Sequence, residues 1–402
     1  MAPQPSNISP QSRLIEVATL FLRLGLTAFG GPAAHIAIMR DEVVNKRKWI
    51  TEQEFLDLFG AANLIPGPTS TEMAIYLGYR RIGWMGLLLG GVCFIMPAMV
   101  IVLGLSWAYI HYGGTPWAGG ILYGIMPVVM AIVAQALWGL GRKAVKNRLT
   151  GLIALSAVIL YLLGLNVLII LLFAGLIAML GGNYSKIRMS PLPGILLQFR
   201  ADRVRLRQMI LKQDFRSLVD FGSLLAVPVP FNLALLFINF IKIGATLYGS
   251  GYVLLAYLRA DFVNQLGWLT DKQLIDAIAI GQVTPGPLFT TATFIGYLLG
   301  GLPGALLATL GIFLPSFVFV GISGLFINRI RNSPWTSALL DGVNAASLGL
   351  MLAVSIQLAA TALIDPLTVG VAVICLIILI RFQTNSTWLI AGGALIGLIH
   401  TL

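Results

Sequence analysis

The sequence predicts an all-α polytopic integral membrane protein with two homologous halves that form an inverted-topology repeat. Three observations carry this prediction. Of the 402 residues, 58% are hydrophobic and 10% are charged, whereas soluble domains carry about 25% charged residues. The same motifs recur about 219 residues later, as from Gly25 to Gly244. Basic loops in one copy are uncharged in the other, and this exchange indicates inversion. The low share of charged residues also excludes a soluble enzyme.

Spanning helices are expected wherever apolar runs reach about 17–25 residues. Continuous runs of that kind occupy Leu14–Met39, Gly83–Ile110, Gly119–Leu140, Leu233–Leu258, Leu302–Ile327 and Ser337–Ile364. Two other regions, Leu152–Leu180 and Leu367–Ile399, are broken by short polar turns and predict pairs of shorter helices. Pro-Gly-Pro interrupts two further apolar segments, Phe55–Leu77 and Leu274–Leu299. Breaks at membrane depth require backbone that is buried in protein or lines a cavity, so these segments predict re-entrant broken helices.

The repeat extends over about 80 residues of each half. Its matched residues are Gly25 with Gly244, Thr27 with Thr246, Arg40 with Arg259, Trp49 with Trp268, Asp57 with Asp276, Pro66-Gly67-Pro68 with Pro285-Gly286-Pro287, and Pro97 with Pro315. The chain therefore divides into a first half at 1–182, a basic linker at 183–222 and a second half at 223–402.

The charge pattern decides how the halves are related. Lys46-Arg47-Lys48 and Arg80-Arg81 have uncharged counterparts in the second half, whereas the second-half loop with Arg329 and Arg331 has an uncharged counterpart. Because basic loops stay in the cytoplasm, equivalent loops should lie on opposite sides of the membrane. The linker, with eight basic residues and three acidic ones, is expected in the cytoplasm. It is interpreted as a topology anchor, with anionic-lipid binding as the alternative.

The paired Pro-Gly-Pro segments are the strongest candidates for a site. Two prolines around a glycine end one helix, and the second proline can begin another. The new helix then presents free N–H groups and the positive end of its dipole, which together form an anion site. The candidate residues are Asn63, Pro66, Gly67, Pro68, Thr69, Ser70 and Thr71, with Gln282, Pro285, Gly286, Pro287, Thr290 and Thr291 in the second half. The alternative is a proline kink that relieves packing strain.

Two cations inside apolar helices form the second candidate. Arg23 and Lys242 occupy equivalent positions, each four residues before a threonine, Thr27 or Thr246. A charge at mid-membrane costs about 2.5–3.5 kcal/mol, so the pair predicts a binding role, with snorkelling at a helix end as the alternative. Glycines beside them, Gly30 and Gly31, either allow close helix packing or break a helix at the site.

Glu72 has no carboxylate counterpart in the second half. It could carry a proton for coupled transport, or it could merely complement the helix dipole in the first turn.

No nucleotide-binding loop, metal-ligand motif or nucleophile elbow occurs, and no basic region is interleaved with stacking aromatics. We therefore expect no catalytic residues, no cofactor, no metal and no nucleic-acid partner.

At these motifs the sequence resembles the chromate ion transporter family in its long, two-domain form. The residues that carry the resemblance are Ala28-Phe29-Gly30-Gly31-Pro32, Asn63 with Pro66-Gly67-Pro68, Gln282 with Pro285-Gly286-Pro287, and Gly296-Tyr297. The resemblance covers nearly all of 14–400. It implies an inner-membrane carrier that exports chromate, with sulfate as the isosteric competitor. A carrier of sulfate or another oxyanion, an anion channel and an intramembrane enzyme are the alternatives, and the sequence leaves open whether the chain forms a homodimer.

Overall fold

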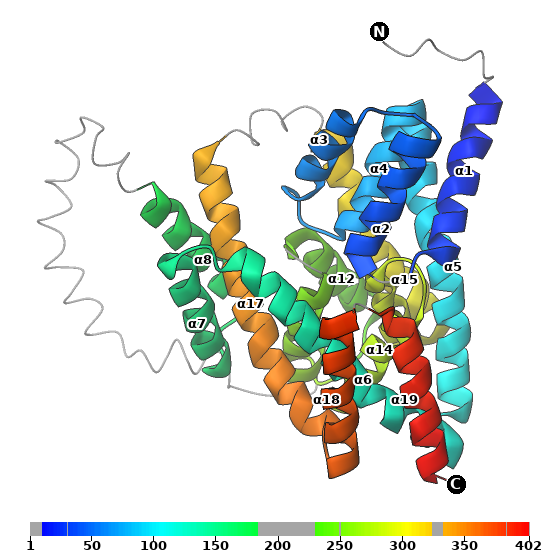
Figure 1. Cartoon of the computed structure of the whole chain (residues 1–402), viewed down its shortest axis with the longest axis vertical. Coiled ribbons are helices and arrows are strands. Elements are labelled where there is room, and N and C mark those ends of the chain that lie inside the picture. The colour runs from blue at the N-terminus through cyan, green and yellow to red at the C-terminus, as the bar shows by residue number, and fades with distance from the viewer. Residues whose placement is uncertain are drawn as a thin grey trace, which may run out of the picture.

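The computed structural model describes residues 10–29, 31–183, 230–248, 251–323, 333–382 and 384–401, and every regular element in these ranges is helical (Figure 1). The first half contains α1 (Pro10–Thr27), α2 (Gly31–Arg40), η1 (Asp41–Lys46), α3 (Glu52–Ala62), α4 (Thr69–Ile82), α5 (Trp84–Tyr112), α6 (Pro116–Ala144), α7 (Arg148–Leu162) and α8 (Val167–Gly182). The second half contains α12 (Leu233–Thr246), η2 (Gly251–Val253), α13 (Leu254–Leu258), η3 (Arg259–Gln265), α14 (Asp271–Val283), η4 (Leu288–Thr290), α15 (Thr291–Ser323), α17 (Pro334–Ala362), α18 (Pro366–Phe382) and α19 (Ser386–Thr401).

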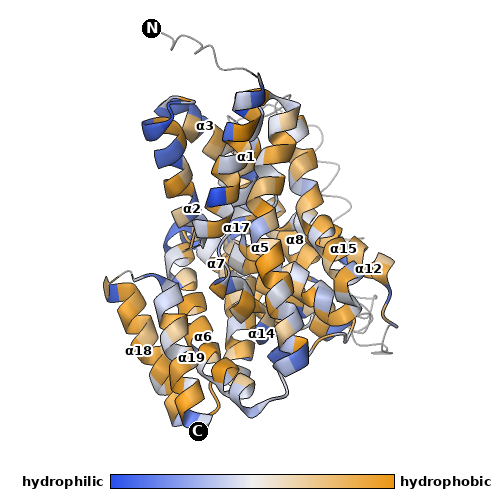
Figure 2. Ribbon diagram, turned by 90° about the vertical axis from the view of Figure 1, so that its right-hand side faces the viewer, coloured by the Kyte–Doolittle hydropathy of each residue, from blue (hydrophilic) through white to orange (hydrophobic). Residues whose placement is uncertain are grey.

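Four helical stretches in the described part of the chain are long and apolar enough to cross a membrane: α5, α6, Leu288–Ser323 and α17. Hydrophobic residues run along most of these helices, and hydrophilic ones gather towards the ends of the molecule, most visibly around α3 (Figure 2). Many large apolar side chains on the helices are exposed, for example Leu88 and Leu310. A water-soluble protein would bury such side chains, so the chain is a multi-pass membrane protein.

Two of the predicted continuous spans are wrong. The expected span Leu14–Met39 breaks after Thr27 and resumes at Gly31 as α2, and the expected span Leu233–Leu258 likewise ends at Thr246. In the first half the cause lies in Gly31 and Pro32. Gly31 has φ of 76°, which only glycine adopts readily, and Pro32 lacks the N–H that would continue the helix.

The repeat seen in the sequence recurs as a repeated order of elements. A π-helix, η1 or η3, precedes a short helix, α3 or α14, that begins with a threonine capping box at Thr51 or Thr270. Next to each cap lies an equivalent ion pair: Arg40 Nε lies 2.7 Å from Glu52, and Arg259 Nε lies 2.8 Å from Asp271. α15 is kinked at Gly301, which has φ of 60°. The equivalent position in the first half is Gly83, with φ of 68°, which separates α4 from α5.

The two halves interlock through their longest helices. α6 of the first half packs against α18 and α19, whereas α17 of the second half packs against α7 and α8. Glycines permit the close approach, because a Cβ at Gly124 would overlap the backbone of Gly393 in α19, and one at Gly342 would overlap the backbone of Ala174 in α8. Each half therefore completes its core with a helix pair from the other.

Candidate functional site

Each Pro-Gly-Pro segment ends one helix and begins the next. In the first half α3 ends at Ala62, Gly67 takes φ of 137°, and Pro68 is the N-cap of α4. In the second half α14 ends at Val283, and Pro287 is the N-cap of the short helix η4, which leads into α15. We call residues 63–68 the first tip and residues 282–287 the second tip. Each tip thus contains the helix break that the sequence predicts.

The tips bind reciprocally to the opposite halves. The N–H of Gly67 donates to the carbonyl oxygen of Leu247 at 2.8 Å, and the N–H of Gly286 donates to the carbonyl oxygen of Ala28 at 3.0 Å. Leu247 and Ala28 are equivalent residues that directly follow α12 and α1. Each tip therefore docks on the break in the first helix of the other half, and the four broken segments meet in one region.

A cavity of about 1070 Å³ adjoins this region. The first half contributes Asn63, Pro68, Thr69 and Ser70 from the predicted site, and the second half contributes Gly251, Leu288 and Phe289. Arg142 and Lys143 from the last turn of α6 also line it, as do Thr384, Asn385 and Ser386, which precede and begin α19. The cavity is thus bordered by a helix N-terminus, hydroxyls and two cations.

The first turn of α4 offers free hydrogen-bond donors to this cavity. The N–H groups of Thr71 and Glu72 both bond to the carbonyl of Pro68, at 2.8 and 3.0 Å. The amides of Thr69 and Ser70 have no partner among the described residues, and neither do their hydroxyls. Exposed N–H groups at the positive end of a helix dipole bind anions. This end of α4 can therefore ligate an oxyanion with backbone and hydroxyl donors together.

Comparison with known proteins places the chain. The chromate transporter family matches residues 15–179 and 200–398. This chain belongs to the chromate transporter family. The chromate transport protein of Cupriavidus metallidurans is 32% identical over 395 residues, which cover 97% of this chain and 94% of that protein. The chromate transport protein of Pseudomonas aeruginosa is 31% identical and covers 91% of this chain and 86% of its own length. No solved structure matches the chain.

In this chromate-family chain, the residues that follow the second tip are less polar than those that follow the first. Leu288 and Phe289 stand where the first half has Thr69 and Ser70. The hydroxyls of Thr290 and Thr291 donate to the carbonyl oxygens of Pro287 and Leu288, at 2.9 and 2.8 Å. These hydroxyls donate to carbonyls of their own turn, and neither residue lines the cavity, so the polar donors come mainly from the first half.

Arg23 and Lys242 are placed outside the cavity lining. Arg23 Nη2 lies 2.7 Å from Glu42, and Lys242 Nζ lies 2.8 Å from Asp261, the equivalent carboxylate of the second half. The hydroxyl of Thr27 donates to the backbone carbonyl of Arg23 at 2.8 Å. The hydroxyl of Thr246 donates to the backbone carbonyl of Lys242 at 2.7 Å. Arg23 and Thr27 therefore lie in one ion-paired cluster with Glu42, and Lys242 and Thr246 lie in the equivalent cluster with Asp261.

Several other predicted residues lie beside the site without lining it. Pro66 and Gly67 are buried in the first tip, and Pro285 and Gly286 are buried in the second. Gln282, at the end of α14, has a buried amide nitrogen without a described partner. Gly30 and the linker at 184–222 fall outside the described residues.

Arg142 and Lys143 are the residues that sequence reasoning missed. Both are exposed, and neither forms an ion pair with a residue in the described ranges. Their only signal is a basic pair at the end of an apolar helix, and that pattern is equally typical of a topology anchor. Only the packing of α6 against α18 and α19 brings the pair to the cavity that contains Thr69 and Ser70.

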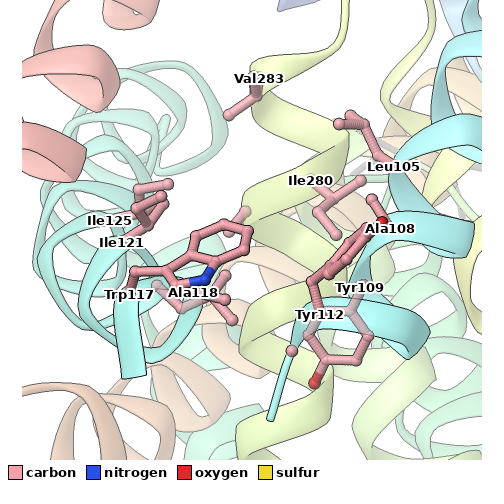
Figure 3. Close-up of a pocket in the computed structure, with 13 residues that line it drawn as sticks. Leu105, Ala108, Tyr109, Tyr112, Trp117, Ala118, Ile121, Ile125, Ile280 and Val283 are labelled. Carbon is pink, nitrogen blue, oxygen red and sulfur yellow. The ribbon is translucent and has the colours of Figure 1, made fainter. Parts of the chain in front are cut away.

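A second cavity, of about 240 Å³, lies between α5, α6 and α14 (Figure 3). Figure 3 shows Trp117 and Tyr109 on opposite walls, with Ile280 of α14 between them. Its lining is apolar and aromatic and contains no charged side chain. At its edge the Tyr109 hydroxyl donates to Asp276 Oδ2 at 2.8 Å. Such a surface cannot ligate a dianion, so this cavity is not the candidate site.

The two helices that carry the tips are packed to different extents. α14 packs against α6, α15 and α17, and Ile275 in it is 0% exposed. α3 packs chiefly against α4, and Leu56, the residue equivalent to Ile275, is 47% exposed. α3 therefore leaves one apolar face uncovered, whereas protein covers the equivalent face of α14. Among the described residues no group of three His, Cys, Asp or Glu could hold a metal.

Proposed function

We propose that the chain is a secondary transporter that exports chromate, a tetrahedral dianion, across the inner (plasma) membrane. Family membership and relatives named chromate transport protein support the substrate. The observation that carries the proposal is the large cavity. The free donors of Thr69 and Ser70 line the same cavity as the cations Arg142 and Lys143.

The binding site follows from the chemistry of these donors. The amides and hydroxyls of Thr69 and Ser70 would bond two chromate oxygens, and Asn63 would supply a further amide donor. Arg142 and Lys143, which line the same cavity, would balance the two negative charges. For Arg23 and Lys242 to reach the anion, their ion pairs with Glu42 and Asp261 would have to open.

The two halves are proposed to be inverted in the membrane, with the Pro-Gly-Pro tips re-entering from opposite sides. The repeated order of elements supports this relation, as does the reciprocal docking of the tips. The start of α1 and the end of α19 also lie at opposite ends of the molecule (Figure 1). Transporters built this way bind substrate near the membrane midplane between the repeats.

The membrane potential favours export. Each charge is worth about 2.3 kcal/mol per 100 mV, so a dianion that leaves an inside-negative cell gains about 4.6 kcal/mol. That gain supports an outward gradient of about a thousandfold at about 1.4 kcal/mol per decade. Arg80 and Arg81 end the helix beside α3, and the positive-inside rule assigns that end to the cytoplasm. Chromate would then enter from that side and move along the protein to the cavity at the start of α4.

Flux of radiolabelled chromate into everted membrane vesicles tests the function. We expect saturable uptake that increases with an interior-positive potential and is accelerated by unlabelled chromate loaded inside. Sulfate in place of chromate measures selectivity between the two oxyanions. Conduction without counterflow would identify a channel instead, and vesicles with no flux above an empty-vector control would contradict the proposal.

The inverted repeat predicts where the two ends of the second half lie. A tag inserted near Lys212 in the linker should be protected from reagents in the periplasm, and a tag after Leu402 should be accessible to them. Labelling of intact and permeabilised cells measures both positions. Two tags on the same side of the membrane would exclude the inverted arrangement.

A further inference from the structure

Glu72 is an enclosed carboxyl group between the two halves. It lies in the first turn of α4 and is 0% exposed. Ser316 of α15 donates a hydrogen bond to Glu72 Oε1 at 3.4 Å, and Oε2 has no partner in the described structure. A Cβ at Gly67 would overlap the carboxyl oxygen. The first tip therefore lies directly on Glu72 and leaves no room for water between them.

No basic group balances this carboxyl. The ionisable groups that act on it are Tyr76 on its own helix and Tyr248, which follows α12. Tyr76 hydrogen-bonds Ser323, and Ser316 is the neighbouring polar group from α15. A buried carboxylate with neither a cationic partner nor full hydrogen bonding is too costly to persist, so the group neutralises. Glu72 therefore holds a proton in this conformation.

We infer that Glu72 is a proton-binding site, and that its protonation is coupled to oxyanion binding at the N-terminus of the same helix. The inference rests on the proposed function, because it requires the anion to bind at Thr69 and Ser70. A metal cation is the less suitable occupant. It would need several oxygen ligands, and Ser316 supplies the one side-chain oxygen that hydrogen-bonds this carboxyl among the described residues.

Electrostatics gives the sign of the coupling. Thr69, Ser70 and Glu72 share the first turn of α4, so an ionised Glu72 would repel a dianion held by the first two and would compete for the positive helix end. A protonated Glu72 does neither. Proton and anion therefore favour each other's binding, and linkage makes the effect reciprocal. A higher pH removes the proton and must weaken anion binding.

The first tip carries the coupling to the second half. Gly67 packs on the Glu72 carboxyl while its N–H bonds to Leu247. Ionisation would require hydration, and hydration requires the tip to leave the carboxyl. Loss of the proton would thus loosen the docking of the first tip on the second half. Chromate carried with one proton keeps a net charge of −1, so the membrane potential still drives export.

Equilibrium binding of radiolabelled chromate to the purified full-length protein in lipid nanodiscs tests this inference. In a series of rising pH, affinity should fall once Glu72 begins to ionise in the anion-free protein, by up to about tenfold per pH unit for one coupled proton. The Glu72→Gln variant should bind chromate at the highest pH of the series about as well as at the lowest. The matched control Glu54→Gln removes a carboxylate from the α3–Arg80 ion pair and should keep the wild-type pH response.

A second measurement does not depend on whether a variant folds. At a pH in the range over which the wild-type affinity falls, chromate added to the weakly buffered wild-type protein should cause net proton uptake, after correction for the same addition to protein-free buffer. Binding without proton uptake, or a Glu72→Gln variant with the wild-type pH response, would overturn the inference and leave the proposed function intact. If chromate did not bind the wild-type protein at any pH, the proposed function itself would fail, and this inference with it.

Discussion

Replacement of Gly67 by alanine is expected to abolish chromate transport. Gly67 has φ of 137°, and a non-glycine residue there would bear about 1–3 kcal/mol of backbone strain. The added Cβ would also overlap both Glu72 and Ser316. Because these atoms belong to the interface between the halves, relief of the overlap should displace the first tip and break its bond to Leu247.

The matched control for this substitution is Gly164→Ala in the turn between α7 and α8. Gly164 also has positive φ, 85°, but no heavy atom lies within 4 Å of its added Cβ. The control therefore isolates backbone strain from steric overlap and should retain most transport. Chromate flux into proteoliposomes at matched protein content measures both variants. Equal flux through the two would mean that the first tip does not need its close contact with Glu72.

Simultaneous replacement of Arg142 and Lys143 by alanine should weaken chromate binding by about a hundredfold or more. Each lost donor to a charged group costs about 1.5–3 kcal/mol, and about 1.4 kcal/mol corresponds to a tenfold change. Both side chains are exposed to the cavity and lie outside the core, so the fold should persist. The half-saturation constant for chromate flux measures the effect, and thermal unfolding verifies the fold.

Arg148→Ala is the control for charge alone. Arg148 is exposed at the start of α7, near the same pair in sequence, but it does not line the cavity. Its replacement should leave the half-saturation constant within about twofold. Arg23→Ala and Lys242→Ala complete the comparison. If either of these lost chromate binding while the Arg142 and Lys143 double variant kept it, the positive charge would come from α1 and α12.

The sequence was sufficient to predict the helical membrane fold, the repeat and the paired helix breaks. Each of these depends on local properties: long apolar runs, recurrent motifs, and prolines that cannot donate a backbone hydrogen bond. The same local reasoning identified Asn63, Pro68, Thr69 and Ser70, which the structure brings to one cavity.

Contacts between distant segments could not be predicted in this way. Glu42 follows Arg23 across a broken helix, so no helical spacing indicates that the two form an ion pair. Arg142 reaches the cavity because α6 packs against α18 and α19, more than 200 residues further along the chain. Helix periodicity indicates which face of a helix is apolar, but it does not identify the helix that will cover it.

Because the two halves interlock, it matters for assembly that they are encoded as one chain. A chain divided within residues 184–229 would give two polypeptides, neither of which could complete its own core. The first would expose the surface of α6 that α18 and α19 cover, and its tip would lack the Leu247 carbonyl. The two fragments would have to meet in the membrane before either became stable, so their assembly would depend on the amount of each. Fusion into one chain replaces this encounter by a folding step at a high effective concentration, and it fixes the ratio of the two halves at one to one.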